Sequence, residues 1–394
     1  MSPIAETLDE SAAYSCMTRP YRWLTTYGQQ PAYVRRGADL SNLILLQSEW
    51  KEPAIDTATA SVAPQSDNRL RRRPLPSVSV GDAFDKIRLL PDDSVDCVVT
   101  SPPYWGLRAY GQSHDETVLE KWAEMHPGMS PDDLRKHPPG YDWYRKSGGV
   151  LGLEPFPDWF VGHLVEFFER IRPKLKADAS VWVNLGDTYF ARWSSVRADG
   201  RQGLGAGERT RRRTPSVGYL HDKQQLLVPA RFAIAMQDTK WILRNDLIWA
   251  KTAVPPRPER DRLRLSHEHV FHFVQRSRTG RPAYYYDLER VESGARDVVQ
   301  VNSSRGRDGH SATFPAELIE PRILSSSRPG GLVVDPFCGT GSTLEAAVRL
   351  GRRSFGIEMS PAFAASARKN LSKVRTLLAA EDGGAGSPDG NTGK

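Results

Sequence analysis

Cysteine is scarce in this chain of 394 residues, with Cys16, Cys97 and Cys338 standing far apart and without metal-ligand spacing. This scarcity argues against a disulfide framework and a cysteine zinc site, and it is typical of a reducing compartment. Long apolar runs are also missing, since no stretch reaches the roughly 18 apolar residues of a membrane helix. Residues 1–30 contain no apolar signal core. We therefore expect a cytoplasmic protein with no membrane partner and no bound metal.

Positive charge is present but unevenly placed. The net charge of +7 suits a polyanionic partner only weakly. Between Arg192 and Arg213, seven arginines stand against two acids in a Gly/Ser-rich stretch, and a smaller group spans Arg257–Arg264. Such runs are usually solvated faces. The glycine and serine content of the larger group predicts a mobile loop whose arginines can reach phosphates.

A short apolar strand followed by two prolines stands near residue 100. Ser94–Thr100 is a β-branched run of the kind that forms a buried strand in a parallel sheet. Pro102 and Pro103 then force the chain out of the sheet, because proline donates no hydrogen bond to a neighbouring strand. The loop offers a serine hydroxyl, a fixed carbonyl and two aromatic rings, which suit a planar base with an exocyclic amine. Pro-Pro-Tyr alone is more often a surface turn.

A second strand-and-turn unit lies far downstream. Gly331–Thr343 is an apolar strand followed by an acid and a glycine-rich turn, and Leu344–Leu350 has helical spacing. A further strand, Ser354–Ile357, ends at Glu358, near the place where a nucleotide-binding unit holds ribose hydroxyls. The spacing to that acid is short, and Leu344 stands where G-x-G-x-x-G has its third glycine. A nicotinamide cofactor is therefore the poorer hypothesis.

Together these stretches resemble the S-adenosylmethionine-dependent DNA amino-methyltransferases. The turn resembles that family's methionine-binding loop, and Ser101-Pro102-Pro103-Tyr104 resembles its catalytic motif. The catalytic motif precedes the cofactor loop by about 230 residues, which is similar to the permuted β-class order. Further matches cover most of residues 77–378. The Ser-Pro-Pro-Tyr form is typical of enzymes that methylate cytosine N4, whereas adenine N6 enzymes more often begin the motif with Asp or Asn.

The resemblance implies site residues for this chain. Ser101 and the Pro102 carbonyl would hold the amine hydrogens, with Pro103 stiffening the loop and Tyr104 stacking on a base turned out of the duplex. Residues 248–251 and 266–269 resemble a block that builds the target-base pocket. The cofactor, S-adenosyl-L-methionine, would be bound by Asp82, Thr313, Phe314, Asp335, Pro336, Phe337, Cys338, Gly339, Thr340, Gly341, Glu358 and Met359.

Three alternatives remain beside this reading. Adenine N6 methylation needs the same geometry with a larger pocket. Cytosine C5 methylation needs a cysteine nucleophile in the catalytic loop, and Cys97 stands inside the expected strand, so we set it aside. A basic nucleic-acid-binding module that has lost activity is disfavoured by the intact motifs.

The expected fold is α/β, a doubly wound, mostly parallel sheet of Rossmann-like methyltransferase type with circularly permuted motif order. Residues 1–76 read as an N-terminal extension and linker, 77–378 as the catalytic domain and 379–394 as a disordered tail. An amphipathic helix at Asp158–Lys176 is assigned to the core.

Two insertions, at about 106–150 and 188–225, are expected to contact duplex DNA. The first interleaves basic and aromatic side chains, a pattern that suits an opened base pair. In relatives the target-recognition segment commonly follows the strand expected at Val270–Val274, but only about 35 residues separate it from the Thr-Phe-Pro segment here. We therefore expect shared readout by the two insertions. DNA contacts are predicted for Trp105, Arg108, Arg209, Arg211, Arg212, Arg213 and Lys251, and a separately acting restriction endonuclease is the expected companion.

Overall fold

A computed structural model of the chain describes residues 77–106, 112–190, 193–197, 209–252, 260–277, 280–291, 296–302 and 314–384. These residues all belong to one compact unit. At 193–197, 209–213 and 381–384 only the backbone is described. The expected extension and linker at 1–76 lie outside the described residues, as do residues 385–394 of the expected tail.

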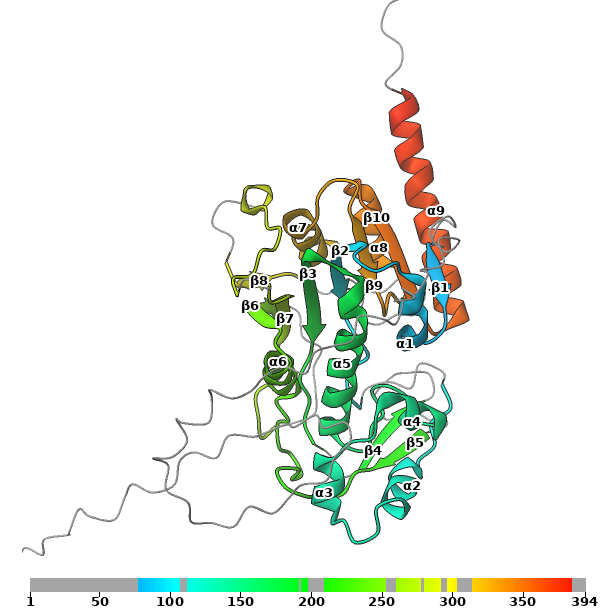
Figure 1. Ribbon diagram of the computed structural model, residues 1–394, viewed down its shortest axis with the longest axis vertical. Coiled ribbons are helices and arrows are strands. Elements are labelled where there is room, and N and C mark those ends of the chain that lie inside the picture. Colours follow the sequence, from blue (N-terminus) through cyan, green and yellow to red (C-terminus); the bar gives the residue numbers. More distant parts are fainter. Residues whose placement is uncertain are drawn as a thin grey trace, which may run out of the picture. The chain divides into compact units, whose positions relative to one another are not determined.

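An eight-stranded sheet with the order β1-β10-β9-β2-β3-β7-β6-β8 forms the centre of this unit (Figure 1). Neighbouring strands pair in parallel, except that β7 runs antiparallel to both β3 and β6. The mostly parallel sheet confirms the predicted fold class. The strands are β1 Val78–Val80, β2 Val95–Thr100, β3 Leu175–Leu185, β6 Ile242–Ala250, β7 His267–Val274, β8 Val298–Gln300, β9 Leu332–Asp335 and β10 Arg353–Glu358.

Helices cover both faces of the sheet, because successive residues of a buried strand point to opposite sides. On β2, Val98 packs in one apolar cluster with α5 and α6, whereas Cys97 and Val99 pack in another with α7 and α8. A strand buried on both faces is what the continuous apolar run predicts, and it confirms the doubly wound architecture. The helices concerned are α1 Ala83–Lys86, α5 Pro157–Ile171, α6 Val228–Asp238, α7 Ala316–Ser326, α8 Ser342–Arg349 and α9 Pro361–Gly384.

Two helix ends differ from the prediction. Helix α5 stops at Ile171, where a 3-10 turn containing Pro173 leads straight into β3, so Leu175 belongs to the strand. Helix α9 continues to Gly384, and residues 379–384 are therefore helical rather than part of a disordered tail. None of the described helices combines the length and the apolar character needed to cross a bilayer.

Both insertions contain regular structure. In the first, α2 Val118–Glu124, α3 Pro131–Lys136 and α4 Tyr141–Lys146 replace the expected long loop. Helix α3 begins at a capping box, in which the side chains of Ser130 and Asp133 bond each other's backbone N–H groups. In the second, β4 Trp193–Arg197 and β5 Arg209–Arg213 form an antiparallel hairpin, so the mobile loop predicted there is wrong for these residues.

Candidate active site

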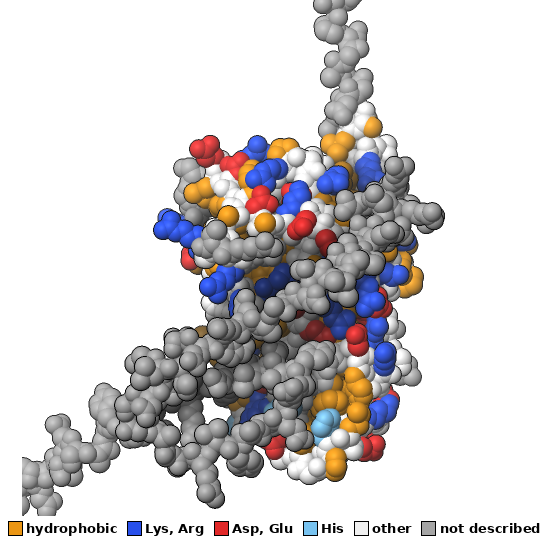
Figure 2. Space-filling model, in the orientation of Figure 1, with side chains coloured by type: hydrophobic (Ala, Val, Ile, Leu, Met, Phe, Trp, Pro, Cys, Tyr) orange, Lys and Arg blue, Asp and Glu red, His pale blue; other side chains and the backbone are white. Residues whose placement is uncertain are grey.

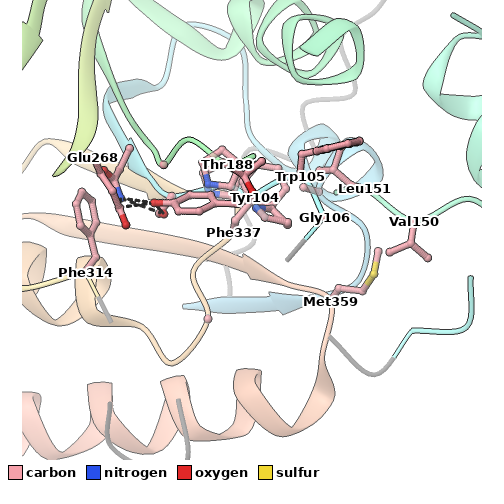
Figure 3. Close-up of a pocket in the computed structure, with 18 of the residues that line it drawn as sticks. Tyr104, Trp105, Gly106, Val150, Leu151, Thr188, Glu268, Phe314, Phe337 and Met359 are labelled. Atoms are coloured by element: carbon pink, nitrogen blue, oxygen red, sulfur yellow. Dashed lines mark hydrogen bonds between the residues drawn. The ribbon is translucent and has the colours of Figure 1, made fainter. Parts of the chain in front are cut away.

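One edge of the sheet gathers the residues that the two motifs contribute. The carboxyl ends of β1, β2, β3, β9 and β10 meet there because these strands are parallel. The antiparallel β7 brings its amino-terminal end to the same edge, where His269 pairs with Leu185 at the end of β3. A pocket of about 900 Å³ opens at this edge (Figure 3). In open α/β sheets this is the edge at which ligands bind.

The catalytic motif lies in this pocket with its two hydroxyl groups joined. Ser101, Pro102, Pro103 and Tyr104 all line the cavity. Ser101 Oγ donates a hydrogen bond to Tyr104 Oη at 3.3 Å, and Tyr104 Oη donates to Glu268 Oε2 at 2.6 Å. The loop after β2 is therefore tied to the start of strand β7, which lies more than 160 residues away in the chain.

Asn184 and Glu268 complete what we call the catalytic cluster, formed by Ser101, Tyr104, Asn184, Lys251 and Glu268. Asn184 Nδ2, near the end of β3, donates to Tyr104 Oη at 2.7 Å, to Glu268 Oε2 at 2.8 Å and to Ser101 Oγ at 3.4 Å. Lys251 Nζ forms an ion pair with Glu268 Oε1. The sequence predicted none of the Asn184 contacts. The only signal was its place near the end of an apolar strand.

Gly186 makes room for the tyrosine ring. A Cβ atom at this position would lie 2.8 Å from Cε2 of Tyr104 and 3.4 Å from Cγ of Glu268. Real Cβ atoms do not approach carbon that closely, so any side chain here would displace the ring. The glycine two residues after Asn184 is therefore required by the packing of the catalytic cluster.

Asp335 is buried at the end of β9, beside the catalytic strand. Its Oδ1 accepts hydrogen bonds from Thr100 Oγ1 at 2.7 Å and from the Phe337 backbone N–H at 3.1 Å. Burial raises the pKa of this carboxyl to about 6, and the hydrogen bonds from Thr100, Thr343 and Phe337 act against that rise. Asp335 thus lines the pocket as a poorly solvated carboxyl at the junction of two strands.

The glycine-rich turn and Glu358 form the next wall of the pocket. Gly339 and Gly341 have φ angles of 51° and 93°, which favour glycine, and Gly341 starts α8. Glu358 at the end of β10 accepts from the backbone N–H groups of Gly339 at 3.0 Å and Ser360 at 2.7 Å, one on each carboxylate oxygen. Burial raises the pKa of Glu358. Each oxygen keeps a lone pair for a ligand hydroxyl.

Asp82 lines the pocket and also holds local structure together. Its Oδ1 caps α1 by accepting from the Phe84 N–H at 2.8 Å, and its Oδ2 accepts from Tyr141 Oη at 2.9 Å. Arg145 lies 3.4 Å from the same oxygen. Asp82 therefore caps a helix as well as lining the pocket, because α1 holds its Oδ1 while Tyr141 and Arg145 of the first insertion hold its Oδ2.

Most of the remaining residues that are predicted to bind the cofactor line the pocket. Pro336, Phe337, Cys338, Thr340, Phe314 and Met359 line the pocket, whereas Thr313 lies outside the described residues. Figure 3 shows Phe314 beside Glu268 on one side of the pocket and Met359 beside Val150 on the other. The pocket is thus long enough to place a cofactor end near Met359 and a substrate end near Glu268.

The residues predicted to contact DNA lie in different parts of the structure. Trp105 is 2% exposed and its indole N–H donates to the Glu154 carbonyl at 3.0 Å, so it belongs to the pocket wall and not to a DNA-facing surface. Lys251 likewise belongs to the catalytic cluster. Arg108 lies outside the described residues, and Arg209–Arg213 form strand β5. On the side of the molecule that Figure 2 shows, the described Lys and Arg side chains are scattered among Asp and Glu.

Several aromatic and basic residues of the first insertion are core residues. Tyr141 and Tyr144 are fully buried, and Tyr141 stacks on Phe84 with ring centroids 3.7 Å apart. Arg135 is buried, bonding Asp132 at 2.9 Å and Asp158 at 2.6 Å. The expectation that the basic and aromatic side chains of the first insertion contact an opened base pair is therefore wrong for Arg135, Tyr141 and Tyr144. Interleaved aromatic and basic residues match a nucleic-acid pattern in sequence, but these three pack against α5.

A family model described as DNA methylase of the N6/N4 type matches residues 95–369. The chain belongs to this methylase family. Type II methyltransferase M.SmaI of Serratia marcescens is 32% identical to the methylase over 308 residues, which is 76% of this chain and 91% of the relative. Type II methyltransferase M.Cfr9I of Citrobacter freundii is 34% identical over 291 residues, covering 72% and 83%. The solved PvuII DNA methyltransferase (cytosine-N4-specific) shares the fold, with a TM-score of 0.50 and 18% identity over 77% of this chain and 92% of that one.

The methylase is thus a DNA methyltransferase that uses S-adenosylmethionine, as its family does. The described pocket fits this cofactor. Its poorly solvated carboxyls, Asp335 and Glu358, suit a ligand that carries positive charge and ribose hydroxyls. The open turn at Gly339, where an added Cβ would meet nothing within 4 Å, leaves backbone space for the amino-acid end. The catalytic cluster lies at the other end of the same pocket.

Proposed function

We propose that the methylase transfers a methyl group to the N4 amine of cytosine in duplex DNA, after the base has been turned out of the helix. The observation that carries this proposal is the setting of Ser101. Its hydroxyl lies within hydrogen-bonding distance of two neutral groups, Tyr104 Oη and Asn184 Nδ2, at the substrate end of the pocket. The first motif position is thus a neutral acceptor rather than a carboxylate, the form typical of cytosine N4 enzymes.

Catalysis by this chain consists of holding the amine. The lone pair of a cytosine amine is delocalised into the ring, so the nitrogen becomes nucleophilic only when its hydrogens are held and its geometry can change. Ser101 Oγ and the Pro102 carbonyl would be the two acceptors for those hydrogens, and both residues line the pocket. Orientation of this kind can lower a barrier by several kcal/mol without a covalent intermediate.

Tyr104 supplies the surface on which the base rests. Its hydroxyl is fixed by Glu268 and Asn184, and its ring edge packs on Gly186. A half-buried ring fixed at both ends can accept a planar base without further ordering, which lowers the entropic cost of base binding.

The opposite end of the pocket would hold the methyl donor. We propose that Asp335 and the turn to Gly341 bind the amino-acid end, Glu358 the ribose hydroxyls, and Met359 with Asp82 the adenine. When bound, S-adenosylmethionine supplies a methyl group activated by its sulfonium centre. Phe337, which packs against Phe167 with ring centroids 5.1 Å apart, provides apolar contact there, and Phe314, which lies beside Glu268, provides apolar contact from the substrate end (Figure 3).

Identification of the methylated nucleoside tests the proposal. Purified protein is incubated with methyl-labelled S-adenosylmethionine and unmodified genomic DNA, and the digested nucleosides are separated by mass spectrometry. We expect label in N4-methylcytosine. Label in N6-methyladenine would keep the fold, cofactor and site but overturn the assignment of the base. Failure to bind S-adenosylmethionine in a titration would instead favour an inactive DNA-binding module.

We also propose that the methylase protects DNA from a restriction endonuclease that acts separately, because its relatives M.SmaI and M.Cfr9I are named Type II methyltransferases. Plasmid DNA from cells that express the methylase should resist a nuclease that cuts at the mapped methylation site. Cleavage of fully methylated plasmid by a nuclease encoded beside the methylase gene would contradict this companionship.

A further inference from the structure

The hydroxyl groups of Ser101 and Tyr104 form a directed chain that ends on a carboxylate. Ser101 Oγ donates to Tyr104 Oη at 3.3 Å, and Tyr104 Oη donates to Glu268 Oε2 at 2.6 Å. We propose that this chain is a proton relay through which Glu268 receives the proton that the target amine loses. The relay rests on the proposed amine methylation, and it serves a cytosine or an adenine amine equally.

The amide of Asn184 sets the direction of the chain. Its Nδ2 donates to both Tyr104 Oη and Glu268 Oε2. The reverse amide orientation would set Oδ1 against the Glu268 carboxylate, which only accepts hydrogen bonds when ionised. Tyr104 therefore accepts from Asn184 and directs its own proton to Glu268. The Ser101 proton is directed to Tyr104 in turn, which leaves a lone pair on Ser101 Oγ for a hydrogen of the substrate amine.

Lys251 balances the charge at the end of the relay. It pairs with Glu268 Oε1, the oxygen that Tyr104 does not use, and its ammonium lies 4.6 Å from the centroid of the Trp249 ring. The side chains of Lys251 and Glu268 are 21% and 13% exposed. At a site this shielded from solvent, a hydrogen bond to a charged carboxylate is stronger than one to a neutral acceptor. Glu268 therefore strengthens the hydrogen bond that it accepts from Tyr104.

The relay accounts for the proton that the amine loses when it is methylated. Methyl transfer would form a nitrogen–carbon bond as the bond between that carbon and the donor's sulfonium sulfur breaks, with its electron pair left on sulfur. The methylated nitrogen then carries one proton more than the product does. That proton passes to Ser101 Oγ as the Ser101 proton passes to Tyr104 Oη and the Tyr104 proton passes to Glu268 Oε2. Both hydroxyls end neutral, as they began. The Glu268 carboxylate becomes a carboxylic acid and then returns the proton to solvent at the open pocket.

Two variants interrupt the relay at different points. Glu268→Gln keeps the size of the side chain but cannot take up the proton, and Tyr104→Phe keeps the ring but removes the middle hydroxyl. In single-turnover assays each is expected to lower the rate of methyl transfer by about 100-fold. The double variant should be no slower than the slower single variant, because both changes break one chain. Dissociation constants for S-adenosylmethionine and DNA should stay within about twofold of wild type.

The controls separate the relay from a structural role. Glu317→Gln, at an exposed position on α7, should match the wild type, and Glu268→Asp should recover part of the rate because it restores a carboxylate. A wild-type rate for Glu268→Gln overturns the relay, and so does a double variant that shows the product of the two single losses. If the wild-type enzyme methylates no nucleoside at all, the proposed function fails and the relay with it.

A separate observation concerns the rim of the pocket. Leu263 is 90% exposed, while Arg262 and Leu265 beside it line the cavity. The segment is held to the second insertion, since Asp261 pairs with Lys223 at 2.5 Å and the Arg262 guanidinium lies 3.6 Å from the centroid of the Tyr189 ring. An apolar side chain therefore projects from a fixed rim.

We infer that Leu263 inserts into the duplex and fills the space that the target base leaves. Exposed arginines on both sides, Arg260 and Arg264, are positioned to contact the flanking phosphates. Apolar side chains unstack base steps in this way in other DNA-binding proteins, and base extraction costs a few kcal/mol that such filling offsets. This inference rests on the proposed base flipping.

Mispaired substrates test the wedge. On duplexes carrying the site mapped with the wild-type enzyme, Leu263→Ala is expected to lower kcat/KM by about tenfold. On the same duplex with the target base mispaired, its loss relative to the wild type should be smaller, because a mispaired base leaves the stack at lower cost. Leu263→Met should retain activity, and Leu377→Ala, a 58% exposed leucine on α9, is the matched control. Equal activity of Leu263→Ala and wild type on the paired site would overturn the wedge, while a wild-type enzyme inactive on duplex DNA would overturn the proposed function.

Discussion

Thr100 donates a hydrogen bond from Oγ1 to Asp335 Oδ1 at 2.7 Å, and this bond joins two residues that are 235 positions apart. Thr100 ends the strand that carries the catalytic motif, and Asp335 ends the strand that carries the cofactor loop. Strands β2 and β9 are neighbours in the sheet. The two halves of the site are therefore held in register by a buried hydrogen bond and not by the long chain between them.

Asp335 should make stability depend on pH. Burial raises its pKa to about 6 in the folded protein, so between about pH 4 and 6 the folded chain binds a proton here that the unfolded chain does not. The stabilisation is present at low pH and is lost as pH rises through 6. Relative to Asp335→Asn, the free energy of unfolding of the wild type should fall by about 2 to 3 kcal/mol from pH 4 to 7. Urea denaturation of both proteins across this range measures it, and a constant difference would contradict the prediction.

Gly186→Ala adds only one methyl group, yet it should strongly disturb the active site. The added methyl group would lie 2.8 Å from the Tyr104 ring, which must then leave its place beside Glu268 and Asn184. We expect loss of about 1 to 3 kcal/mol of stability and at least about a tenfold fall in methyl transfer. Gly140→Ala is the control, because a Cβ there meets only Glu166 Oε2 at 4.0 Å. Unchanged kinetics of Gly186→Ala would show that the ring position is not critical.

Arg135→Ala should destabilise the fold and leave DNA affinity unchanged. The guanidinium bonds Asp132 and Asp158 and lies 5.1 Å from the centroid of the Tyr219 ring, with its side chain 9% exposed. Asp132 keeps Lys136 as a partner and Asp158 keeps Tyr219, so losing the guanidinium should cost about 1 to 3 kcal/mol. Lys136→Ala, on the exposed side of the same helix, should cost less than about 1 kcal/mol. If Arg135→Ala changed the salt dependence of DNA binding, this would show that Arg135 does contact DNA.

Contact between DNA and the arginines of the β4–β5 hairpin remains a prediction. Positions 209, 211 and 213 alternate along β5 and so share one face of the ribbon, with Arg197 opposite Arg209 in the register. A two-stranded ribbon fits the major groove. Replacing Arg209, Arg211 and Arg213 by Gln should lower the slope of log K against log salt by about 3. Lys373→Gln on α9 is the control, and an unchanged slope for the triple variant would remove the hairpin from the DNA interface.

The sequence by itself determined the local units of this protein. A β-branched run that ends in two prolines can only be a strand that leaves the sheet, and β2 ends at Thr100 as expected. Gly339 and Gly341 in a strand-to-helix turn likewise have the φ angles that glycine allows. These features depend on residues close together in the chain, so both motifs, the family and the fold class could be read before any tertiary contact was known.

Only the tertiary structure decided which distant residues share the site. Asn184 and Glu268 meet Tyr104 because β7 runs against β3, and no local pattern gives the direction of a strand. The same limit explains the errors for Trp105 and Tyr141. Aromatic residues in a polar stretch look alike in sequence whether they face DNA or a helix. Their burial depends on segments that the tertiary fold brings against them, Glu154 for Trp105 and His163 of α5 for Tyr141.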